Sequence, residues 1–386
     1  MTNRLTSLGE ERWTIHFESR RRVAAGEDVI ELTIGEPDVP VPPHLIDVAE
    51  TAMRAGRTRY SGGRGDPVMI EAIAKKYSKR TGRSISADHV LCLPGTQAAL
   101  TVAVMSLVET GDAVLVPDPY YATYEGVVRL TGADFIPVPM DAANNFHLTA
   151  EQVEAAVTPN TKVLLLNSPH NPTGATLSAD EIARIGAVCE RHNLWIVSDE
   201  VYEQLIYTGE FASPLDQASL AERTIAVSSI SKSHAAPGFR SGWCVGPPWF
   251  TDLMQGVSEA ILFGGQPFIA DMTATALTQP DDTAATMRRL YQSRIKLLDS
   301  IFAQTNTVKP LIPEAGMFML LDISASGLDG EQYAQRLLNE AGVAVMPGIS
   351  FGNQAKNHIR LSLTVDEDRL AEAARRIVDF SSKLNG

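Results

Sequence analysis

Residues that could form disulfide bonds or bind a metal ion are few in this sequence of 386 residues. The three cysteines, Cys92, Cys189 and Cys244, lie far apart and form no CxxC pair, and the eight histidines show no HExxH or similar spacing. Disulfide frameworks and structural metals need such pairs and clusters. We therefore expect neither a disulfide framework nor a metal site.

Basic residues are in the minority, because 33 Lys and Arg stand against 46 Asp and Glu, which gives a net charge of −13. Nucleic-acid binding needs a basic surface that displaces counterions from phosphates. Runs of about 18 apolar residues are absent, and the polar N-terminus MTNRLTSLGEERWTIHFESRRR lacks the apolar segment of a signal peptide. We expect a cytoplasmic protein that acts on small molecules, without a nucleic-acid or membrane partner.

Short β-branched runs alternate with helical patterns from about residue 70 to residue 280. This alternation is typical of an α/β fold in which helices cover both faces of a mostly parallel sheet. The predicted strands are 89–93, 113–117, 134–138, 162–167, 194–199, 224–229 and 241–246, with helices at 97–108, 178–191 and 249–260.

The pattern changes after residue 280. A long helix over 282–304 leads to strands, and a final helix follows Thr364, which indicates a smaller α+β domain. The predicted strands of this domain are 316–323, 343–347 and 358–363. The segment before about residue 45 contains EPDVPVPP, should be extended, and could join either part.

Ligands of open α/β sheets bind beyond the carboxyl ends of the strands, so the residues that follow each strand are candidates for a site. Pro94-Gly95-Thr96-Gln97 leads from a strand into a helix, whose free N–H groups could bind an anion, although a plain turn is the commoner case. Asp118-Pro119-Tyr120-Tyr121 places aromatic rings at the same edge, where they either contact a ligand or only pack the loop.

Two further strand ends carry polar side chains. Prolines in NSPHNPTG, residues 167–174, fix the backbone and could present Asn171 rigidly to a ligand, or form only a rigid turn. Asp199 directly follows a buried strand, where it needs a cationic or donor partner unless it caps a helix.

The fifth strand end is SSISKSHAAPGFRSGW, residues 228–243. A lysine in such a place is usually a solvated surface charge, but Ser229, Ser231 and Arg240 surround Lys232 with donors that suit a phosphate. His234 is expected to pack. An anion site, an aromatic face, a carboxylate and a lysine together describe a site for pyridoxal 5'-phosphate (PLP), whose aldehyde needs an amine.

Seven ordered motifs carry a resemblance over nearly the full chain: LTIGEPDVPVP, TRYSGGRGDP, PGTQAAL, NSPHNPTGA, VSDEVYEQLIY, SSISKSHAAPGFRSGW and HIRLSLT. They resemble the fold-type I aminotransferases of class I/II, the aspartate aminotransferase-like superfamily. The resemblance implies a three-layer large PLP-binding domain with a mostly parallel mixed sheet over 46–280. It also implies a smaller α+β domain, with an N-terminal arm, from 1–45 and 281–386, and a homodimer with shared active sites.

The resemblance also implies roles for the catalytic residues. Lys232 matches the lysine that forms the internal aldimine with PLP and moves the proton at the substrate Cα. Asp199 matches the carboxylate that pairs with the pyridine nitrogen. Asn171 and Tyr202 match the donors to the 3'-oxygen of the cofactor, which lower the imine pKa toward the working pH.

The remaining residues would hold the phosphate, the ring and the substrate. Tyr121 matches the aromatic residue on the cofactor ring, and Tyr60 matches a tyrosine that reaches the phosphate from the partner subunit. Arg360 matches the arginine that grips the substrate α-carboxylate, with the Gly35 N–H and Asn171 assisting. The predicted phosphate-end residues are Gly95, Thr96, Gln97, Ser229, Ser231 and Arg240, and cis bonds are expected at Asp118-Pro119 and Asn171-Pro172.

The implied reaction is a ping-pong transfer of an amino group from an L-amino acid to a 2-oxo acid, pyruvate or 2-oxoglutarate. Some dicarboxylate-specific relatives have a lysine at the position of Thr96, so strict aspartate specificity is in doubt. The stretches SKSH, ILFGGQPFI and GMFMLLDISASGL are most similar to arginine–pyruvate transaminases.

Three other functions compete with this interpretation. A PLP-dependent β-lyase that cleaves C–S bonds would use the same fold and the same lysine. A non-catalytic PLP-binding regulator would need an added basic DNA-binding domain, and only a short segment precedes LTIGEPD. A nicotinamide dehydrogenase would need GxGxxG after a strand, but the glycine-rich GGRGDP at 62–67 follows no clear strand.

Overall fold

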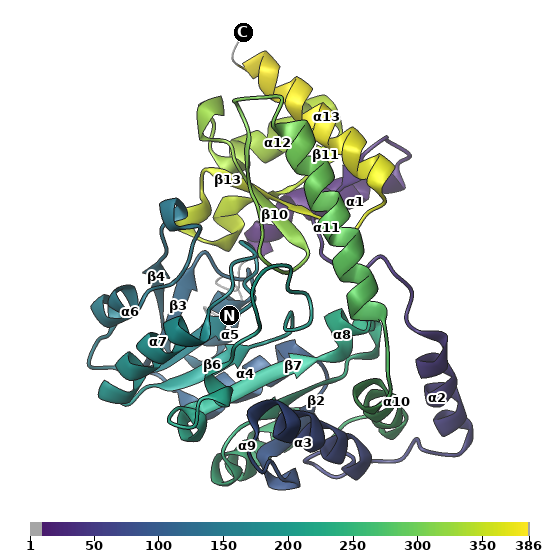
Figure 1. Cartoon of the computed structure of the whole chain (residues 1–386), viewed down its shortest axis with the longest axis vertical. Coiled ribbons are helices and arrows are strands. Elements are labelled where there is room, and N and C mark those ends of the chain that lie inside the picture. The colour runs from purple at the N-terminus through teal and green to yellow at the C-terminus, as the bar shows by residue number, and fades with distance from the viewer. Residues whose placement is uncertain (1–9, 385–386) are drawn as a thin grey trace, which may run out of the picture.

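The computed structural model describes residues 10–384 (Figure 1). Residues 1–9 of the predicted N-terminal arm lie outside the described residues. The largest sheet has seven strands in the order β2-β8-β7-β6-β5-β3-β4, and only β8 runs antiparallel to its neighbours. These strands are β2 (Val90–Leu93), β3 (Ala113–Asp118), β4 (Asp134–Pro139), β5 (Thr161–Asn167), β6 (Trp195–Asp199), β7 (Thr224–Ser229) and β8 (Gly242–Val245). The predicted fold class is confirmed.

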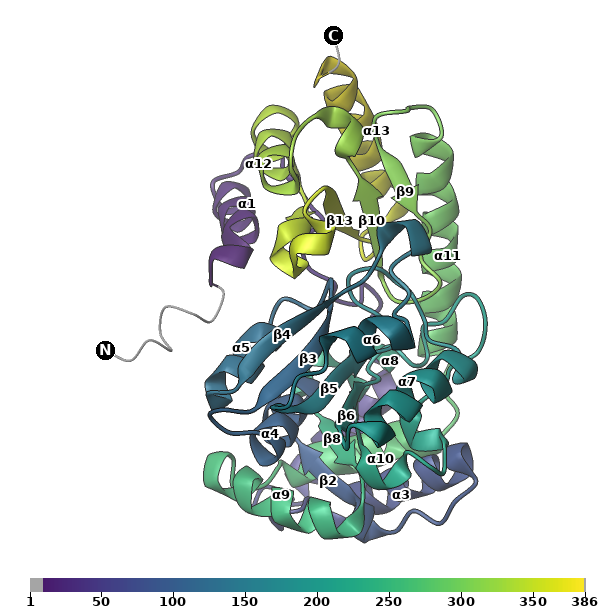
Figure 2. The same ribbon diagram turned by 90° about the vertical axis from the view of Figure 1, so that its left-hand side faces the viewer.

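Alternate residues of the central strands enter different cores, because successive side chains of a strand point to opposite faces. Val114 and Val116 pack on the face with α4 (Thr96–Leu107), α5 (Tyr124–Thr131) and α9 (Pro248–Ile261). Leu115 packs on the other face. The helices of that second face are α3 (Pro67–Thr81), α6 (Ala150–Ala156), α7 (Ala179–Arg191) and α10 (Pro267–Thr278). Figure 2 shows α4 and α5 on one side of the sheet and α6 and α7 on the other.

A second, antiparallel sheet has the order β12-β13-β10-β9 and lies above the first in Figure 1. Its strands are β9 (Lys309–Leu311), β10 (Phe318–Asp322), β12 (Met346–Pro347) and β13 (His358–Ser362). The helices of this part are α11 (Thr283–Phe302), α12 (Gly330–Ala341) and α13 (Glu367–Leu384). Their apolar faces meet the sheet in one core that includes Leu298, Leu337 and Ile377.

The N-terminal segment joins this C-terminal part. Strand β1 (Ile30–Glu31) pairs in parallel with β11 (Val343–Ala344), and Ile15 of α1 (Thr14–Ala24) enters the same core. The chain then returns to the large sheet through α2 (Pro43–Arg54), which packs on α10. The segment that the sequence could assign to either part therefore packs mainly with the C-terminal part before the chain returns to the large sheet.

Short helical turns complete the connections. The four-residue helix α8 (Ile230–Ser233) follows β7. The 3₁₀ turns are η2 (Glu10–Trp13), η3 (Ala87–His89), η4 (Ala142–Asn144), η5 (Pro214–Asp216), η6 (Ala221–Arg223), η7 (Pro237–Phe239), η8 (Ser324–Ser326), η9 (Gly348–Phe351) and η10 (Asn353–Ala355). Within residues 10–384 no helix is long and apolar enough to cross a membrane. The same residues contain no cluster of three or more His, Cys, Asp or Glu side chains that could hold a metal ion.

Candidate active site

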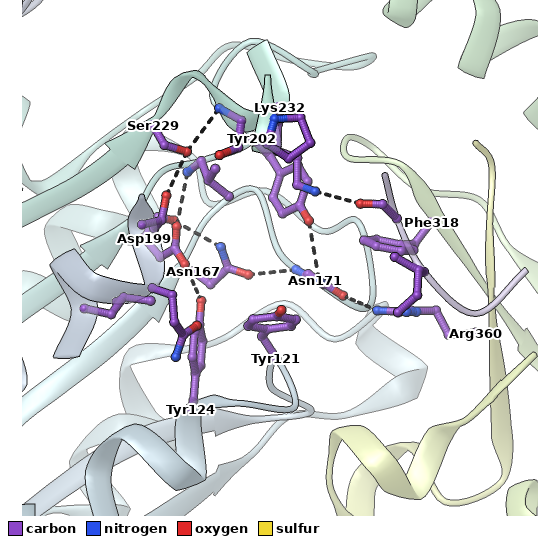
Figure 3. Close-up of a pocket in the computed structure, with 18 of the residues that line it drawn as sticks. Tyr121, Tyr124, Asn167, Asn171, Asp199, Tyr202, Ser229, Lys232, Phe318 and Arg360 are labelled. Atoms are coloured by element: carbon purple, nitrogen blue, oxygen red, sulfur yellow. Dashed lines mark hydrogen bonds between the residues drawn. The ribbon is translucent and has the colours of Figure 1, made fainter. Parts of the chain in front are cut away.

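A cavity of about 230 Å³ lies at the carboxyl ends of β5, β6 and β7, between the two sheets (Figure 3). Its floor comes from the large sheet, and its far wall comes from β10, β13 and the segment after β1. Most of the site residues predicted from the sequence lie in this cavity. Those that line the cavity are Gly35, Thr96, Gln97, Tyr121, Asn171, Asp199, Tyr202, Ser229, Ser231, Lys232, Arg240 and Arg360.

Lys232 projects from α8 into the cavity, where its Nζ donates a 2.6 Å hydrogen bond to the carbonyl oxygen of Gly35. Desolvation lowers the pKa of Lys232 to about 8, and the positive charges of Arg360 and Arg240 act in the same direction. A lysine with a lowered pKa supplies the free amine that attack on an aldehyde requires.

Asp199 ends β6 with its carboxylate buried in the floor of the cavity. It accepts a 2.7 Å hydrogen bond from the hydroxyl of Tyr124 and one of 3.2 Å from the N–H of Val201. Burial raises the pKa of Asp199 to about 6. Neither of these partners is a cation, so the carboxylate is oriented but its charge is not paired, which suits a cationic group on a ligand.

Arg360, on β13, is buried against the ring of Phe318, with 3.9 Å between its guanidinium carbon and the ring centroid. It donates hydrogen bonds of 3.0 Å to Oδ1 of Asn171 and 2.6 Å to the carbonyl oxygen of Thr33. Its Nε is buried without a hydrogen-bond partner, and burial lowers the pKa of Arg360 to about 10. A buried guanidinium without a carboxylate partner fits an incoming anion such as a substrate carboxylate.

Asn171 and Tyr202 lie side by side near the centre of the cavity, with 3.5 Å between the amide nitrogen and the phenolic oxygen (Figure 3). Asn167, at the end of β5, holds this arrangement from behind. Its amide donates to the carbonyl oxygen of Asp199 at 3.0 Å, and its Oδ1 accepts from the N–H of Asn171 at 2.8 Å. The Asn167 side chain thus links Asp199, at the end of β6, to the loop after β5 that carries Asn171.

The opposite end of the cavity is built for an anion. Gly95 precedes α4 with a φ of 88°, and no side chain caps the N–H groups of this helix. A Cβ at Gly95 would lie 2.2 Å from Nη2 of Arg240, so only glycine lets the guanidinium approach the helix N-terminus. The Thr96 hydroxyl donates to Oγ of Ser229 at 2.9 Å, and the Ser231 N–H donates to the same atom at 3.3 Å.

Three predicted residues need separate description: Gly95 and Tyr60 are not among the residues that line the cavity, and Gly35 lines it with its carbonyl oxygen toward Lys232. Tyr60 does not line the cavity: its side chain is 85% exposed and its ring meets that of Phe263, 5.4 Å away between centroids. Gly35 presents its carbonyl oxygen to Lys232, and a Cβ there would lie 2.1 Å from the Phe318 ring. Gly35 therefore provides close packing as well as backbone polarity.

Other sequence expectations concern the surroundings of the site. His234 packs as predicted, because it is buried and its Nε2 contacts the carbonyl oxygen of Ala276 at 2.9 Å. The peptide bonds before Pro119 and Pro172 are cis, as expected, and the bond before Pro169 is cis as well. The cavity residues that sequence reasoning missed are Trp13, Ile34, Leu100, Tyr124, Asn167, Val201, Pro237 and Phe318.

The charges of the cavity test whether PLP fits. Three cationic side chains, Lys232, Arg240 and Arg360, face a single carboxylate, Asp199. Such an excess of positive charge in a partly desolvated space is stabilised by anions. A phosphate at the start of α4, a protonated pyridine nitrogen at Asp199 and a carboxylate at Arg360 would balance these charges, so the residues fit the cofactor and an amino acid.

Comparison with known proteins supports the same class, that of PLP-dependent transferases of fold type I. The family model for aminotransferase class I and II matches residues 27–377. Arginine–pyruvate transaminase AruH of Pseudomonas aeruginosa is 38% identical over 385 residues, which cover 100% of this chain and 98% of that protein. Aspartate aminotransferase of Geobacillus stearothermophilus is 32% identical, and the match covers 92% of each chain. The solved structure of Thermus thermophilus aspartate aminotransferase with maleate is 31% identical, with a TM-score of 0.93 over 98% of this chain and 99% of that chain.

The chain belongs to the class I and II aminotransferase family. It is a PLP-dependent transaminase, as predicted, and these relatives give no support to the β-lyase alternative. When bound, PLP links to amines through its aldehyde and withdraws electrons from the Cα of a linked amino acid, which makes amino-group transfer possible.

Proposed function

We propose that this transaminase takes amino acids with a long, uncharged or basic side chain, arginine above all, and uses pyruvate as its acceptor. The observation that carries this proposal is the set of cations in the cavity. Among the cavity-lining residues of 10–384, the cationic side chains are Lys232, Arg240 and Arg360. Each has another role, so this chain offers no further described cation for the second carboxylate of aspartate, glutamate or 2-oxoglutarate.

The lining of the cavity also suits such a donor. Trp13 and Ile34 line it, and the residue that begins α4 is the uncharged Thr96. The negative charge of Glu36 acts on Lys232 by raising its pKa, so it also acts on a cation in the same space. A guanidinium can stack on an indole ring and pair with a carboxylate. The 38% identical relative named arginine–pyruvate transaminase agrees with this choice.

Each site residue then has a chemical role. Lys232 accepts and returns the proton at the substrate Cα, because it is the amine at the centre of the cavity. When PLP is bound, Asp199 would keep the pyridine nitrogen protonated, and Asn171 and Tyr202 would donate hydrogen bonds to the 3'-oxygen. Arg360 orients the α-carboxylate, with Gly35 and Asn171 beside it. Tyr121 would stack on the ring, and the phosphate would be held by Gly95, Thr96, Gln97, Ser229, Ser231 and Arg240.

The assembly belongs to the same proposal. An 85% exposed tyrosine beside an exposed Phe263 is costly for a lone chain. A homodimer in which Tyr60 reaches the phosphate of the partner subunit would cover both rings. We also propose that 46–280 form the PLP-binding domain, that 1–45 and 281–386 form the small domain, and that the enzyme works in the cytoplasm.

The test is a donor survey with the purified holoenzyme. Each common amino acid is added alone and the absorbance of the bound cofactor is followed, since a transaminase converts its cofactor with the donor only. We expect arginine to react fastest and aspartate slowly, with pyruvate restoring the spectrum better than 2-oxoglutarate. A preference for aspartate or glutamate would overturn the proposed specificity. Release of ammonia and pyruvate without cofactor conversion would indicate a lyase instead.

Loss of Lys232 tests the chemistry itself. Lys232→Ala should lower kcat by at least about 10³-fold, because the group that moves the Cα proton is gone. Addition of a small alkyl amine should restore part of the rate, whereas an alkyl alcohol of the same size should not. Wild-type turnover in this variant would contradict the assignment of Lys232.

A further inference from the structure

A buried cluster of charges adjoins the turn that carries Tyr202, and none of the charged residues in the cluster lines the cavity. The end of β6 and the turn that follows it carry three cavity residues, Asp199, Val201 and Tyr202. The same turn carries two acids, Glu200 and Glu203. Glu200 is fully buried, and the Glu203 side chain is 8% exposed. Neither acid lines the cavity, so neither is explained by the site described above.

Helix α3 supplies the cations that meet these acids. Lys76 and Arg80 are four residues apart and therefore lie on one face of the helix. Arg80 binds both acids through the same nitrogen: Nη1 is 2.8 Å from Oε2 of Glu200 and 3.1 Å from Oε2 of Glu203. Lys76 forms a second ion pair with Glu203. The two acids of the turn are thus joined to each other through one guanidinium.

Further contacts hold the guanidinium of Arg80, of which only Nη2 is buried without a hydrogen-bond partner. Its Nε donates a 2.9 Å hydrogen bond to Oδ1 of Asp216, and its carbon lies 4.4 Å from the Tyr77 ring centroid and 5.2 Å from that of Phe211. A planar, always charged fork between two rings loses little freedom when it binds. The arrangement holds the turn at a set distance from α3.

Burying this many charged groups between a helix and a turn costs free energy of desolvation. Three carboxylates, those of Glu200, Glu203 and Asp216, share two cations, Lys76 and Arg80, in a largely buried space. Apolar side chains would usually stabilise such a contact as well or better. Ionic contacts give direction instead, because hydrogen bonds fix angles as well as distances. The direction of this turn decides where Asp199 and Tyr202 point.

We propose that Arg80 is a positioning residue of the transaminase. By binding Glu200 and Glu203 it fixes the turn, so that Asp199 faces the pyridine nitrogen and Tyr202 faces the 3'-oxygen of the cofactor. The inference rests on the roles proposed above for Asp199 and Tyr202. Removal of Arg80 leaves Glu200 without its cation and Glu203 with Lys76 alone, and the turn then rotates away from the cofactor.

The test compares Arg80→Met with Lys79→Met, which removes the same charge from an exposed position of the same helix. Two properties are measured: the Kd of the apo protein for PLP, and the pH midpoint at which the absorbance of the holoenzyme changes. We expect Arg80→Met to weaken PLP binding about tenfold and to raise the midpoint, because the donation from Tyr202 to the 3'-oxygen is weakened. Lys79→Met should keep both wild-type values.

Two further variants keep the proposal falsifiable if Arg80→Met does not fold. Arg80→Lys retains the charge without the fork, and Lys76→Met retains Arg80 alone, so each should shift the spectroscopic midpoint partway. Wild-type Kd and midpoint in the folded members of this set would overturn the proposal, since a merely destabilised fold does not move the midpoint. Asp199→Asn, measured in parallel, distinguishes a failure of this proposal from a failure of the role proposed for Asp199. If Asp199→Asn leaves PLP binding unchanged, the role of Asp199 itself is wrong.

Discussion

The hydroxyl of Tyr124 and the carboxylate of Asp199 form a 2.7 Å hydrogen bond, and both groups are buried beneath the cavity. Tyr124 belongs to the first turn of α5, and Asp199 ends β6, so the bond joins a helix to the floor of the site. It fixes one carboxylate oxygen without neutralising it. The carboxylate of Asp199 is therefore oriented before PLP binds. We expect the affinity for PLP to depend on whether this carboxylate is ionised.

The first prediction concerns the pH dependence of PLP binding by the apo protein. The pKa of Asp199 is about 6 because burial raises it. A protonated pyridine nitrogen prefers the ionised carboxylate, so affinity is full above this pKa and falls as pH drops through it, by about tenfold per pH unit below. The Kd measured by fluorescence between about pH 5 and pH 8 checks this.

A matched variant is needed here because the phosphate of PLP also titrates near pH 6. In Asp199→Asn the contribution of the phosphate remains and that of the carboxylate is lost. The wild-type curve should therefore be steeper than the variant curve at low pH, and the variant should bind more weakly at neutral pH. Two parallel curves would contradict the role of Asp199.

The second prediction concerns Arg360 and the donor. Arg360→Lys keeps the charge but loses the planar fork, while the Phe318 ring and Asn171 remain in place. A hydrogen bond to a charged group contributes about 1.5–3 kcal/mol, so kcat/KM for the donor should fall roughly 10- to 100-fold. The Kd for PLP should stay within about twofold, because Arg360 lies at the substrate end of the cavity. An equal loss of cofactor and donor binding would show that Arg360 supports the fold of the site instead.

The sequence predicted the parts of this site that follow from local pattern. Asn171, Asp199 and Lys232 lie at the ends of apolar strands or within four residues of them, and parallel strands bring such ends to one edge. Asn167 was within reach of the same argument, because it begins the quoted segment NSPHNPTG. The large sheet and the helices that cover it could also be predicted, because the apolar residues of buried strands and of amphipathic helices repeat at different intervals.

The wall of the cavity was not predictable in this way. Trp13 and Phe318 come from η2 and β10, far apart in the sequence and far from the large sheet along the chain. Nothing in their local pattern distinguishes them from ordinary packing residues. Trp13 reaches the cavity because β1 pairs with β11 and places the N-terminal segment on the C-terminal part, whereas Phe318 reaches it from β10 of the second sheet. The contacts of Arg80 with the turn after β6 have the same origin in tertiary packing.

The third prediction separates contact from strain at the phosphate end. Gly95→Ala places a methyl group 2.2 Å from Nη2 of Arg240 and also strains a backbone with a φ of 88°. Gly56 has a nearly equal φ of 81°, but nothing lies within 4 Å of a Cβ there. Both alanine variants should lose about 1 kcal/mol of stability from strain, which thermal unfolding measures. Only Gly95→Ala should also weaken PLP binding, because the guanidinium must move; unchanged affinity would argue against a phosphate at this place.

The fourth prediction concerns a histidine that bridges the two parts of the chain. His147 contacts Glu181 of α7 through Nδ1 at 3.2 Å, and Glu314, which precedes β10, through Nε2 at 3.0 Å. The hydrogen bond to Glu314 is the largest cause of a raised His147 pKa, and burial opposes it. Because the folded pKa lies above the unfolded value of about 6.5, the stabilisation is complete below that value and is lost as pH rises through the folded pKa.

His147→Gln keeps hydrogen-bonding capacity but cannot carry the charge. Its Tm should therefore lie below the wild-type Tm at about pH 6, and the difference should shrink toward about pH 9 as the stabilisation from the charge is lost. His192, whose Nε2 contacts Glu154 on the surface, provides the control His192→Gln. That exposed pair joins neighbouring helices of one part only, so its removal should change Tm much less at either pH. A Tm difference for His147→Gln that stays constant across this range would mean that shape, and not charge, accounts for the contribution of His147.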